Sequence, residues 1–394
     1  MSKKISFQES KAIAILKTSL VFFVIYGHMN PDTVSFAAAD FPILSFRGIS
    51  NALAIAISYT FAHAIVPTYF LLSGYLFWAG IEGWNWETFS RKLKSRSQTL
   101  LLPYFLWNAI SISSCILYII YQIARGSAAW TDVADYWNNV GFRGFWDISI
   151  WGTHKTNWIG MSIPSSAPID LPIWFIRDLM VVTLFAPALY WLFKKTKIWG
   201  LLILLFCFVS KIWPQIHGFS VDSFSCFGLG LYMAMNGKTL VGFAEKIRIP
   251  AIIYTSVTAA IVIYYDSVRT VEGRFFFPFF ALGCIWVYLY LSLILVRKWD
   301  ISLPNWLVKS SFFIYALHAC PLPRIGTIIS KVNSYTVPAF AKISAPWIVW
   351  YLLSPLIIIG VCLIVFYIVE WCAPGLCRAL GGNRLQKAQA NKVQ

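Results

Sequence analysis

The sequence predicts an all-α integral membrane protein with about ten transmembrane helices and with both termini in the cytoplasm. Of its 394 residues, 58% are hydrophobic and only 12% are charged, whereas a soluble protein carries about 25% charged residues. The apolar residues fall into runs long enough to cross a bilayer. Most of the 32 Lys and Arg residues lie in alternate loops, which marks the cytoplasmic side of the membrane.

The apolar runs define the individual spans. The segment 42–57 is less apolar and is a candidate for a short interfacial helix before the second span. The only long loop, 122–170, is predicted outside. We expect a single transmembrane domain over residues 1–372 and a cytoplasmic tail over 373–394. The predicted spans cover residues 12–30, 55–80, 99–122, 172–193, 198–214, 220–236, 250–266, 275–296, 310–330 and 344–370.

The formal charge of +16 does not indicate a nucleic-acid-binding protein. The basic residues sit in short clusters between apolar runs, as in loops held against anionic lipid. The eight cysteines form no CxxC pair, so we expect small buried side chains, with no metal site and no disulfide framework. These features predict a multi-pass protein of the inner (cytoplasmic) membrane.

Ionisable residues within the spans are the first functional candidates, because charge is costly inside a bilayer. Lys17 and His28 lie eleven residues apart in the first span, about three helical turns, so they share nearly one face. The rise between them is about 16 Å. The alternatives are that Lys17 snorkels to the inner interface and that His28 has a purely structural role. Asp32 could orient His28 if the helix continues past Pro31.

The fourth span contains a second charged group, Arg177 and Asp178, near its outer end. Adjacent residues point in different directions on a helix, so we expect each to pair with another helix rather than with its neighbour. Arg177 and Asp178 could form structural ion pairs, or they could contact a substrate. His63 and His318 are the other histidines within spans, and a packed, hydrogen-bonded role is the alternative for each.

Two further groups lie outside the apolar runs. Arg91, Lys92, Lys94 and Arg96 cluster beside the third span, either as lipid anchors or as ligands of a phosphate-rich cytosolic molecule. The long loop contains five tryptophans, which suit either interfacial anchoring or stacking on sugar rings. They are Trp130, Trp137, Trp146, Trp151 and Trp158.

The chain resembles the acyltransferase family 3 membrane proteins, which transfer acetyl or other short acyl groups to extracytoplasmic glycans. The resemblance consists of five features in order along most of the chain. They are the Lys17-to-His28 spacing, PTYFLLSGYLF at 67–77, the basic run leading to LLPYFLW at 101–107, PIWFIRDL at 172–179 and SFFIYALH at 311–318.

The resemblance implies acyl-CoA, with acetyl-CoA as the default, as the cytoplasmic donor, and His28 as the catalytic residue. Lys17, Arg96, Lys94 and Arg91 are then the donor-binding candidates. The substrate-binding candidates are Arg177, Asp178, Trp174, His63 and His318. The family often has Arg-x-x-Arg before the Pro-Tyr of the third helix. Here Arg96 matches the first arginine, but Thr99 stands in place of the second, which puts donor binding at residue 99 in doubt.

The predicted reaction is transfer of an acyl group to a hydroxyl of a cell-surface or lipid-linked glycan. His28 would act as the base or would carry the acyl group, with Tyr26, Ser73 and Arg177 as candidate oxyanion donors. The alternative class is a transporter or exporter of a lipid-linked sugar or polysaccharide. Acyl-CoA use by the purified protein separates the two. The sequence does not indicate an oligomeric state.

Overall fold

The computed structural model describes residues 5–28, 45–148, 155–156, 162–163, 167–214, 216–267, 272–322 and 345–382. Apart from turns and short connections, these residues form helices and one antiparallel pairing of β1 (Lys155–Thr156) with β2 (Ser162–Ile163). The helices are α1 (Phe7–Gly27), α2 (Phe46–Ile55), α3 (Ile65–Trp78), α4 (Trp86–Arg96), α5 (Leu102–Ala124), α6 (Trp130–Asn139), α7 (Trp174–Leu184), α8 (Ala186–Thr196), α9 (Ile198–Ser210), α10 (Val221–Met235), α11 (Leu240–Lys246), α12 (Arg248–Ser267), α13 (Glu272–Trp299), α14 (Asn305–Leu317), α16 (Ala345–Cys372) and α17 (Pro374–Leu380). Short π or 3₁₀ turns are η2 (Ala56–Phe61), η3 (Ala62–Ala64), η4 (Ser97–Leu101), η5 (Gly141–Phe145) and η6 (Leu171–Ile173).

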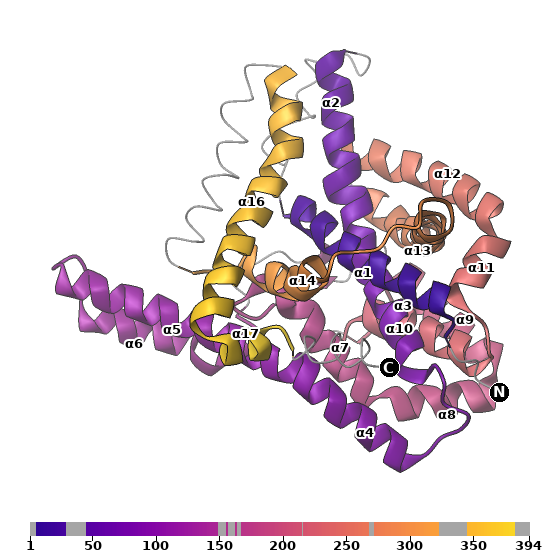
Figure 1. Cartoon of the computed structure of the whole chain (residues 1–394), viewed down its shortest axis with the longest axis horizontal. Coiled ribbons are helices and arrows are strands. Elements are labelled where there is room, and N and C mark those ends of the chain that lie inside the picture. The colour runs from indigo at the N-terminus through magenta and orange to yellow at the C-terminus, as the bar shows by residue number, and fades with distance from the viewer. Residues whose placement is uncertain are drawn as a thin grey trace.

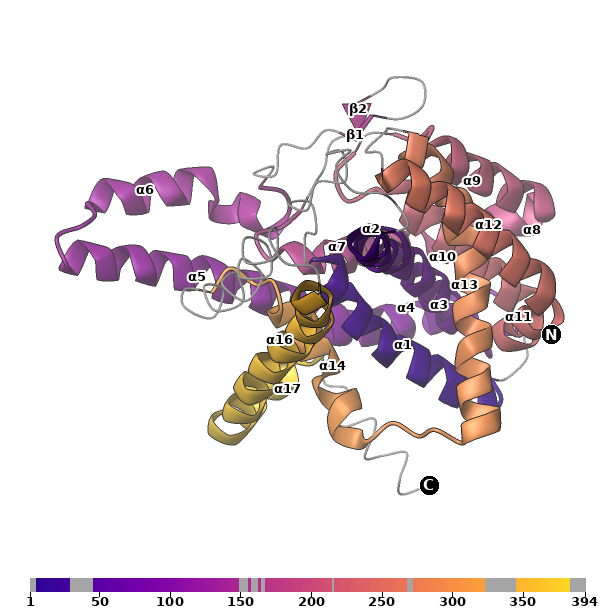
Figure 2. The same cartoon turned by 90° about the horizontal axis from the view of Figure 1, so that it is seen from above.

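Figures 1 and 2 show α1 and α3 in the centre of the helical body, with α11, α12 and α13 on one side. The α5–α6 hairpin projects from the other side in both views. Part of the predicted long loop is therefore helical, since α6 lies within it. Lys17 and His28, which α1 carries on nearly one face, are both partly buried.

Six helical runs in the described part of the chain are long and apolar enough to span a membrane, judged by length and composition. The count rises to seven if α7 and α8, bent by 55° at their junction, form one span. Each of the ten predicted spans overlaps at least one helix in the described residues, but α9, α10 and α14 have only 13, 15 and 13 residues. The protein is multi-pass, and the count of about ten remains a prediction. The runs are Phe7–Gly27, Gly48–Trp78, Trp86–Ala124, Arg248–Tyr265, Phe275–Trp299 and Ile348–Cys372.

The candidate interfacial helix at 42–57 is, from residue 46 onward, the first part of the second run. α2 continues through η2 and η3 into α3 without a break, because the segment contains no Gly or Pro between Leu53 and Val66 to end it. The basic cluster is likewise helical: α4 continues through the π turn η4 into α5. Asn85 caps α4 by accepting from the Glu87 N–H at 2.8 Å, and Lys94 and Arg96 lie in its last turn.

Contacts gather several of the predicted cytoplasmic segments at one end of the bundle. The Glu9 carboxylate in α1 accepts from the Tyr75 hydroxyl at 3.1 Å and from the Leu240 N–H at 2.9 Å. Two residues further on, Lys11 pairs with Asp300 at 2.5 Å. The start of α1, the end of α3, the start of α11 and the end of α13 therefore lie together, as loops on one side of a membrane must. Which side this end faces remains a prediction.

The closest helix pair, α3 and α10, depends on two glycines. A Cβ at Gly74 would lie 2.0 Å from the Phe227 carbonyl oxygen, and one at Gly230 would lie 2.0 Å from the Leu71 oxygen. Backbones can approach this closely only where a residue lacks a side chain, as in small-residue packing between membrane helices. α3 also contacts α1 beside Lys17, since the Tyr69 hydroxyl donates to the Lys17 carbonyl.

Candidate active site

His28 lies directly after the last residue of α1 and caps that helix, its backbone N–H donating to the Ile25 carbonyl at 3.0 Å. Its imidazole lies beside that of His318, which follows α14. The ring centroids are 5.0 Å apart and the planes meet at 60°. The predicted catalytic residue and one predicted substrate-binding residue, from opposite ends of the chain, are thus neighbours.

The hydrogen bond of His318 defines its tautomer. Nδ1 lies 2.7 Å from the Tyr315 carbonyl oxygen, and since a carbonyl only accepts, Nδ1 carries the proton. In the neutral ring Nε2 is then an acceptor. The residue is only 2% exposed, and Nε2 has no hydrogen-bond partner in the described residues. The site therefore contains a proton acceptor beside His28.

His63 lies in the same region. Its Nδ1 is 3.0 Å from the Ser58 carbonyl oxygen, and its ring stacks on Tyr59 with centroids 6.0 Å apart. The turn that carries it packs on the end of α1, since the Ser58 hydroxyl donates to the Tyr26 carbonyl at 2.6 Å. His28 is within electrostatic reach of both His63 and His318. Three predicted site histidines are thus grouped at one end of α1.

Lys17 lies three turns earlier on α1 and is half-buried. Its carbonyl oxygen accepts from the Tyr69 hydroxyl of α3. One turn further along α3, the Ser73 carbonyl accepts from Arg96 Nη2 at 3.2 Å. The structure therefore brings two donor-binding candidates, Lys17 and Arg96, to neighbouring turns of α3.

The other two candidates of the basic cluster lie elsewhere on α4. Arg91 and Lys94 are both exposed. The Arg91 guanidinium lies 3.5 Å from the Thr88 hydroxyl of its own helix. Neither is held against α3 as Arg96 is, so the structure separates the cluster into one inward cation and two outward ones.

Arg177 and Asp178 pair with each other, so the prediction that each would pair only with another helix is wrong. Arg177 Nη2 lies 2.9 Å from Asp178 Oδ1, and both side chains are almost fully buried. Arginine is long enough to fold back across one helical position. Its Nη1 also donates to the Trp146 carbonyl, and its guanidinium lies 5.5 Å from the Trp146 ring. Arg177 therefore holds Trp146 of the predicted long loop against α7, and contact of Arg177 with a substrate stays a prediction.

The remaining candidates have plainer surroundings. Trp174 is half-buried at the start of α7. The Tyr26 hydroxyl donates to the Leu352 carbonyl at 2.8 Å, so this candidate oxyanion donor is already engaged. Of the loop tryptophans in the described residues, Trp130, Trp137 and Trp146 are exposed, and stacking on sugars remains a prediction. Asp32, Trp151 and Trp158 lie outside the described residues.

The sequence analysis missed Asp170, which lies just before η6. It is fully buried, and neither carboxyl oxygen has a hydrogen-bond partner in the described residues. The neighbouring donors serve backbone carbonyls instead: the hydroxyl of Tyr104 donates to Phe145, and that of Tyr315 to Pro172. The available signal was a single acidic residue between Ile169 and Leu171.

Replacing Asp170 with Asn should stabilise the protein at neutral pH. Burial raises the pKa of this carboxyl well above its ordinary value, so the folded state binds a proton that the unfolded chain releases above about pH 3.9. Stability should therefore fall as the pH rises above that value, and Asn removes the loss. Thermal melting of purified D170N and wild type should differ at neutral pH and converge near pH 4. A variant less stable at neutral pH would show that the carboxylate holds the fold.

The geometry defines a class of protein, a multi-pass helical membrane protein with a histidine cluster at one end of a central helix and cations three turns away. A family model described as an acyltransferase domain (acyltransferase family 3) matches residues 10–367. The chain therefore belongs to this family, and it is an acyltransferase of the membrane.

One relative extends this finding over nearly the whole chain. The chain is 25% identical over 401 residues to the succinoglycan biosynthesis protein ExoH of Rhizobium meliloti (strain 1021). The match covers 95% of this chain and 92% of the relative. No solved structure matches the chain.

Proposed function

We propose that the protein transfers an acyl group, acetyl by default, from cytoplasmic acyl-CoA to a hydroxyl of a cell-surface or lipid-linked glycan. The observation that carries this proposal is the arrangement along α1: the His28–His318 pair lies at one end, and Lys17 and Arg96 lie by α3 about 16 Å away. The name of the relative, which refers to succinoglycan biosynthesis, supports a polysaccharide acceptor. We place the protein in the inner membrane.

In the proposed reaction, a neutral His28 imidazole takes the proton from the acceptor hydroxyl. The hydroxyl oxygen forms a bond to the acyl carbon, and the bond from that carbon to sulfur breaks. The departing thiolate then takes the proton back from the His28 imidazolium, so no net proton is released. His318 is the proposed positioning residue, since its ring is the one beside His28.

A second route uses the same residues in two steps. His28 attacks the thioester first, the bond from the acyl carbon to sulfur breaks, and CoA leaves as the thiol with the imidazole proton. The acyl-imidazole then passes its acyl group to the acceptor hydroxyl, whose proton returns to the imidazole. Trapping of a labelled acyl group on the protein in the absence of acceptor would favour this route over direct transfer. Under either route His28 touches the reacting atoms.

Donor binding is the most direct test of the cation positions. Lys17→Met should raise the KM for acetyl-CoA about ten-fold or more and change kcat little, because a charge-assisted bond to phosphate contributes about 1.5–3 kcal/mol. Steady-state kinetics of the purified protein measures both constants. Lys298→Met, which removes an exposed cation at the end of α13, is the matched control. A K17M variant that changes only acceptor affinity would contradict the assignment.

The transporter alternative makes a different prediction. An exporter would move a lipid-linked sugar without consuming a thioester. Purified protein that neither binds nor turns over acetyl-CoA, yet moves a glycan across a vesicle membrane, would replace the transferase proposal.

A further inference from the structure

Trp146 is an exposed tryptophan on a segment that polar contacts hold in place. Its carbonyl accepts from the Arg177 guanidinium of α7, and the carbonyl before it accepts from the Tyr104 hydroxyl of α5. The Asp147 carboxylate, directly after it, pairs with the His217 imidazole between α9 and α10. Three consecutive residues are therefore bound to three different parts of the helical body, which fixes the position of the tryptophan.

The Trp146 ring is partly covered by its neighbours and otherwise open. The Arg177 guanidinium lies over the ring, 5.5 Å from its centroid, and a Cβ at Gly218 would lie only 2.7 Å from the ring. Gly218 has a φ of +85°, so both this conformation and the lack of a side chain favour glycine beside the ring. Trp146 still exposes 45% of its surface. A fixed, flat surface of this kind binds a ligand with little further loss of conformational entropy.

Polar groups lie beside the exposed ring. Asp147 follows Trp146, and His217 precedes Gly218, so the Asp147–His217 pair is formed by the chain neighbours of the two residues in contact. His217 faces the carboxylate through Nδ1, which therefore carries a proton, and its Nε2 can bond to another group. Sugars have apolar C–H faces edged with hydroxyl groups. An aromatic surface with a few placed polar groups is a common form of small-ligand site.

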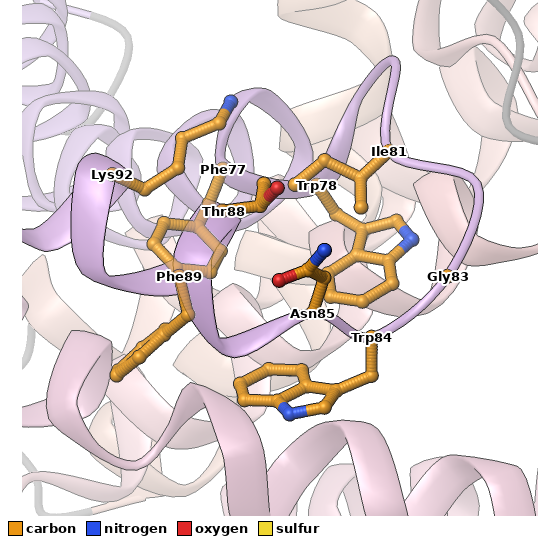
Figure 3. Close-up of a pocket in the computed structure, with 9 residues that line it drawn as sticks. All are labelled: Phe77, Trp78, Ile81, Gly83, Trp84, Asn85, Thr88, Phe89 and Lys92. Carbon is orange, nitrogen blue, oxygen red and sulfur yellow. The ribbon is translucent and has the colours of Figure 1, made fainter.

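The aromatic residues at the turn between α3 and α4 provide a contrast. Figure 3 shows Trp78, Trp84 and Phe89 gathered at this turn. Trp84 stacks on Trp78 with ring centroids 6.1 Å apart, and its ring centroid lies 5.4 Å from that of Tyr190 in α8. These rings pack on one another, so they hold α3, α4 and α8 together. The ring of Trp146 packs instead on a guanidinium and a glycine, and part of it stays open.

Contacts place Trp146 at the same end of the bundle as the histidine pair. The Tyr315 hydroxyl donates to the Pro172 carbonyl, five residues before Arg177, and the Tyr315 carbonyl accepts from His318. His318 is only 2% exposed, whereas Trp146 lies at the surface. One sugar ring therefore cannot stack on Trp146 and reach the histidines at once. Trp146 would contact a different sugar of the acceptor from the one that is acylated.

We propose that Trp146 forms a subsite for a sugar of the acceptor other than the one that receives the acyl group, with His217 binding a hydroxyl of the same sugar. The proposal rests on the proposed function above. The sugar is a pyranose with equatorial hydroxyls, such as a β-linked glucose unit, because its C–H face can lie flat on the ring. The acceptor is then an oligosaccharide or polysaccharide and not a monosaccharide. Membrane-interface anchoring is the competing role for an exposed loop tryptophan.

The test compares two acceptors that differ in length, glucose and cellotetraose, with acetyl-CoA as the donor. Trp146→Ala should raise the KM for cellotetraose roughly ten-fold, as expected for the loss of a central tryptophan at a binding surface, and leave the KM for glucose unchanged. His217→Ala should show the same selectivity. It keeps the ring if W146A folds poorly, and a partly exposed ion pair contributes little to stability. Trp199→Ala, which removes an exposed tryptophan of α9, is the control and should change neither constant.

The outcomes separate the subsite from the reaction. Equal effects of W146A and H217A on both acceptors, as membrane anchoring would give, or no effect on either, would overturn the subsite while the transferase function stands. If the wild-type protein acetylates neither sugar, binding of cellotetraose, measured by calorimetry, decides the subsite on its own. Binding that W146A loses and W199A retains would support the subsite, and no binding to the wild type would overturn it. A protein that neither binds nor turns over acetyl-CoA would contradict the proposed function and not the subsite.

Discussion

His28→Ala should lower the rate of acyl transfer by about 100- to 10,000-fold, the usual contribution of a general base. The protein should fold normally, because the cap of α1 is made by the backbone N–H of residue 28 and not by its imidazole. Transfer of a labelled acetyl group by purified H28A, compared with wild type at equal protein concentration, measures the effect. Size-exclusion profiles and melting temperatures should match those of the wild type.

Added imidazole provides the control for this variant. If His28 acts as a base beside His318, the cavity left by alanine should admit imidazole and restore part of the rate. His28→Gln, which keeps polarity and size but cannot accept a proton at neutral pH, should remain inactive. Near-normal transfer by H28A would show that the base lies elsewhere.

Arg177→Met should destabilise the protein by about 3–5 kcal/mol, the usual cost of leaving a buried charge without its partner. Arg177 is 1% exposed and Asp178 is 2% exposed, so the Asp178 carboxylate would remain buried without its cation. The variant would also lose the hydrogen bond from Arg177 to the Trp146 carbonyl. Thermal melting in detergent, followed by size exclusion, measures the loss.

The double variant R177M/D178N is the matched comparison. Removing both charges should recover much of the stability that R177M loses, because the neutral amide is far cheaper to bury than a carboxylate. Full recovery is not expected, since the Trp146 contact is still missing. A double variant as unstable as R177M would indicate that the loop contact, and not the ion pair, provides the stability.

The sequence predicted the helical membrane fold because the length of its apolar runs is enough to identify membrane-spanning helices. α10 matches its predicted span of 220–236 to within one residue at each end, whereas α9 ends at Ser210, just before Lys211 and four residues before its predicted end at 214. The helical form of α4 was also missed. Its residues are polar, so hydropathy indicated a loop, although Asn85 and Glu87 at its start are typical of a helix N-terminus.

The candidate site was predictable only within a single helix. Helical periodicity places Lys17 and His28 on one face of α1 from sequence alone. The contact of His28 with His318 depends on how α14 packs against α1, which no local pattern encodes. The same reason explains why the Arg177 pairing and the burial of Asp170 were not predicted. Both depend on which polar groups the surrounding helices place beside these side chains.

The most direct test of the account uses purified protein in proteoliposomes that contain an acceptor oligosaccharide inside and receive labelled acetyl-CoA outside. In the molecules whose donor side faces outward, the wild type should label oligosaccharide hydroxyls, and H28A should label them at least about 100-fold more slowly. K17M should need a higher acetyl-CoA concentration than the wild type. Oligosaccharide that stays unlabelled with active wild-type protein, or label transferred equally well by H28A, would contradict the account.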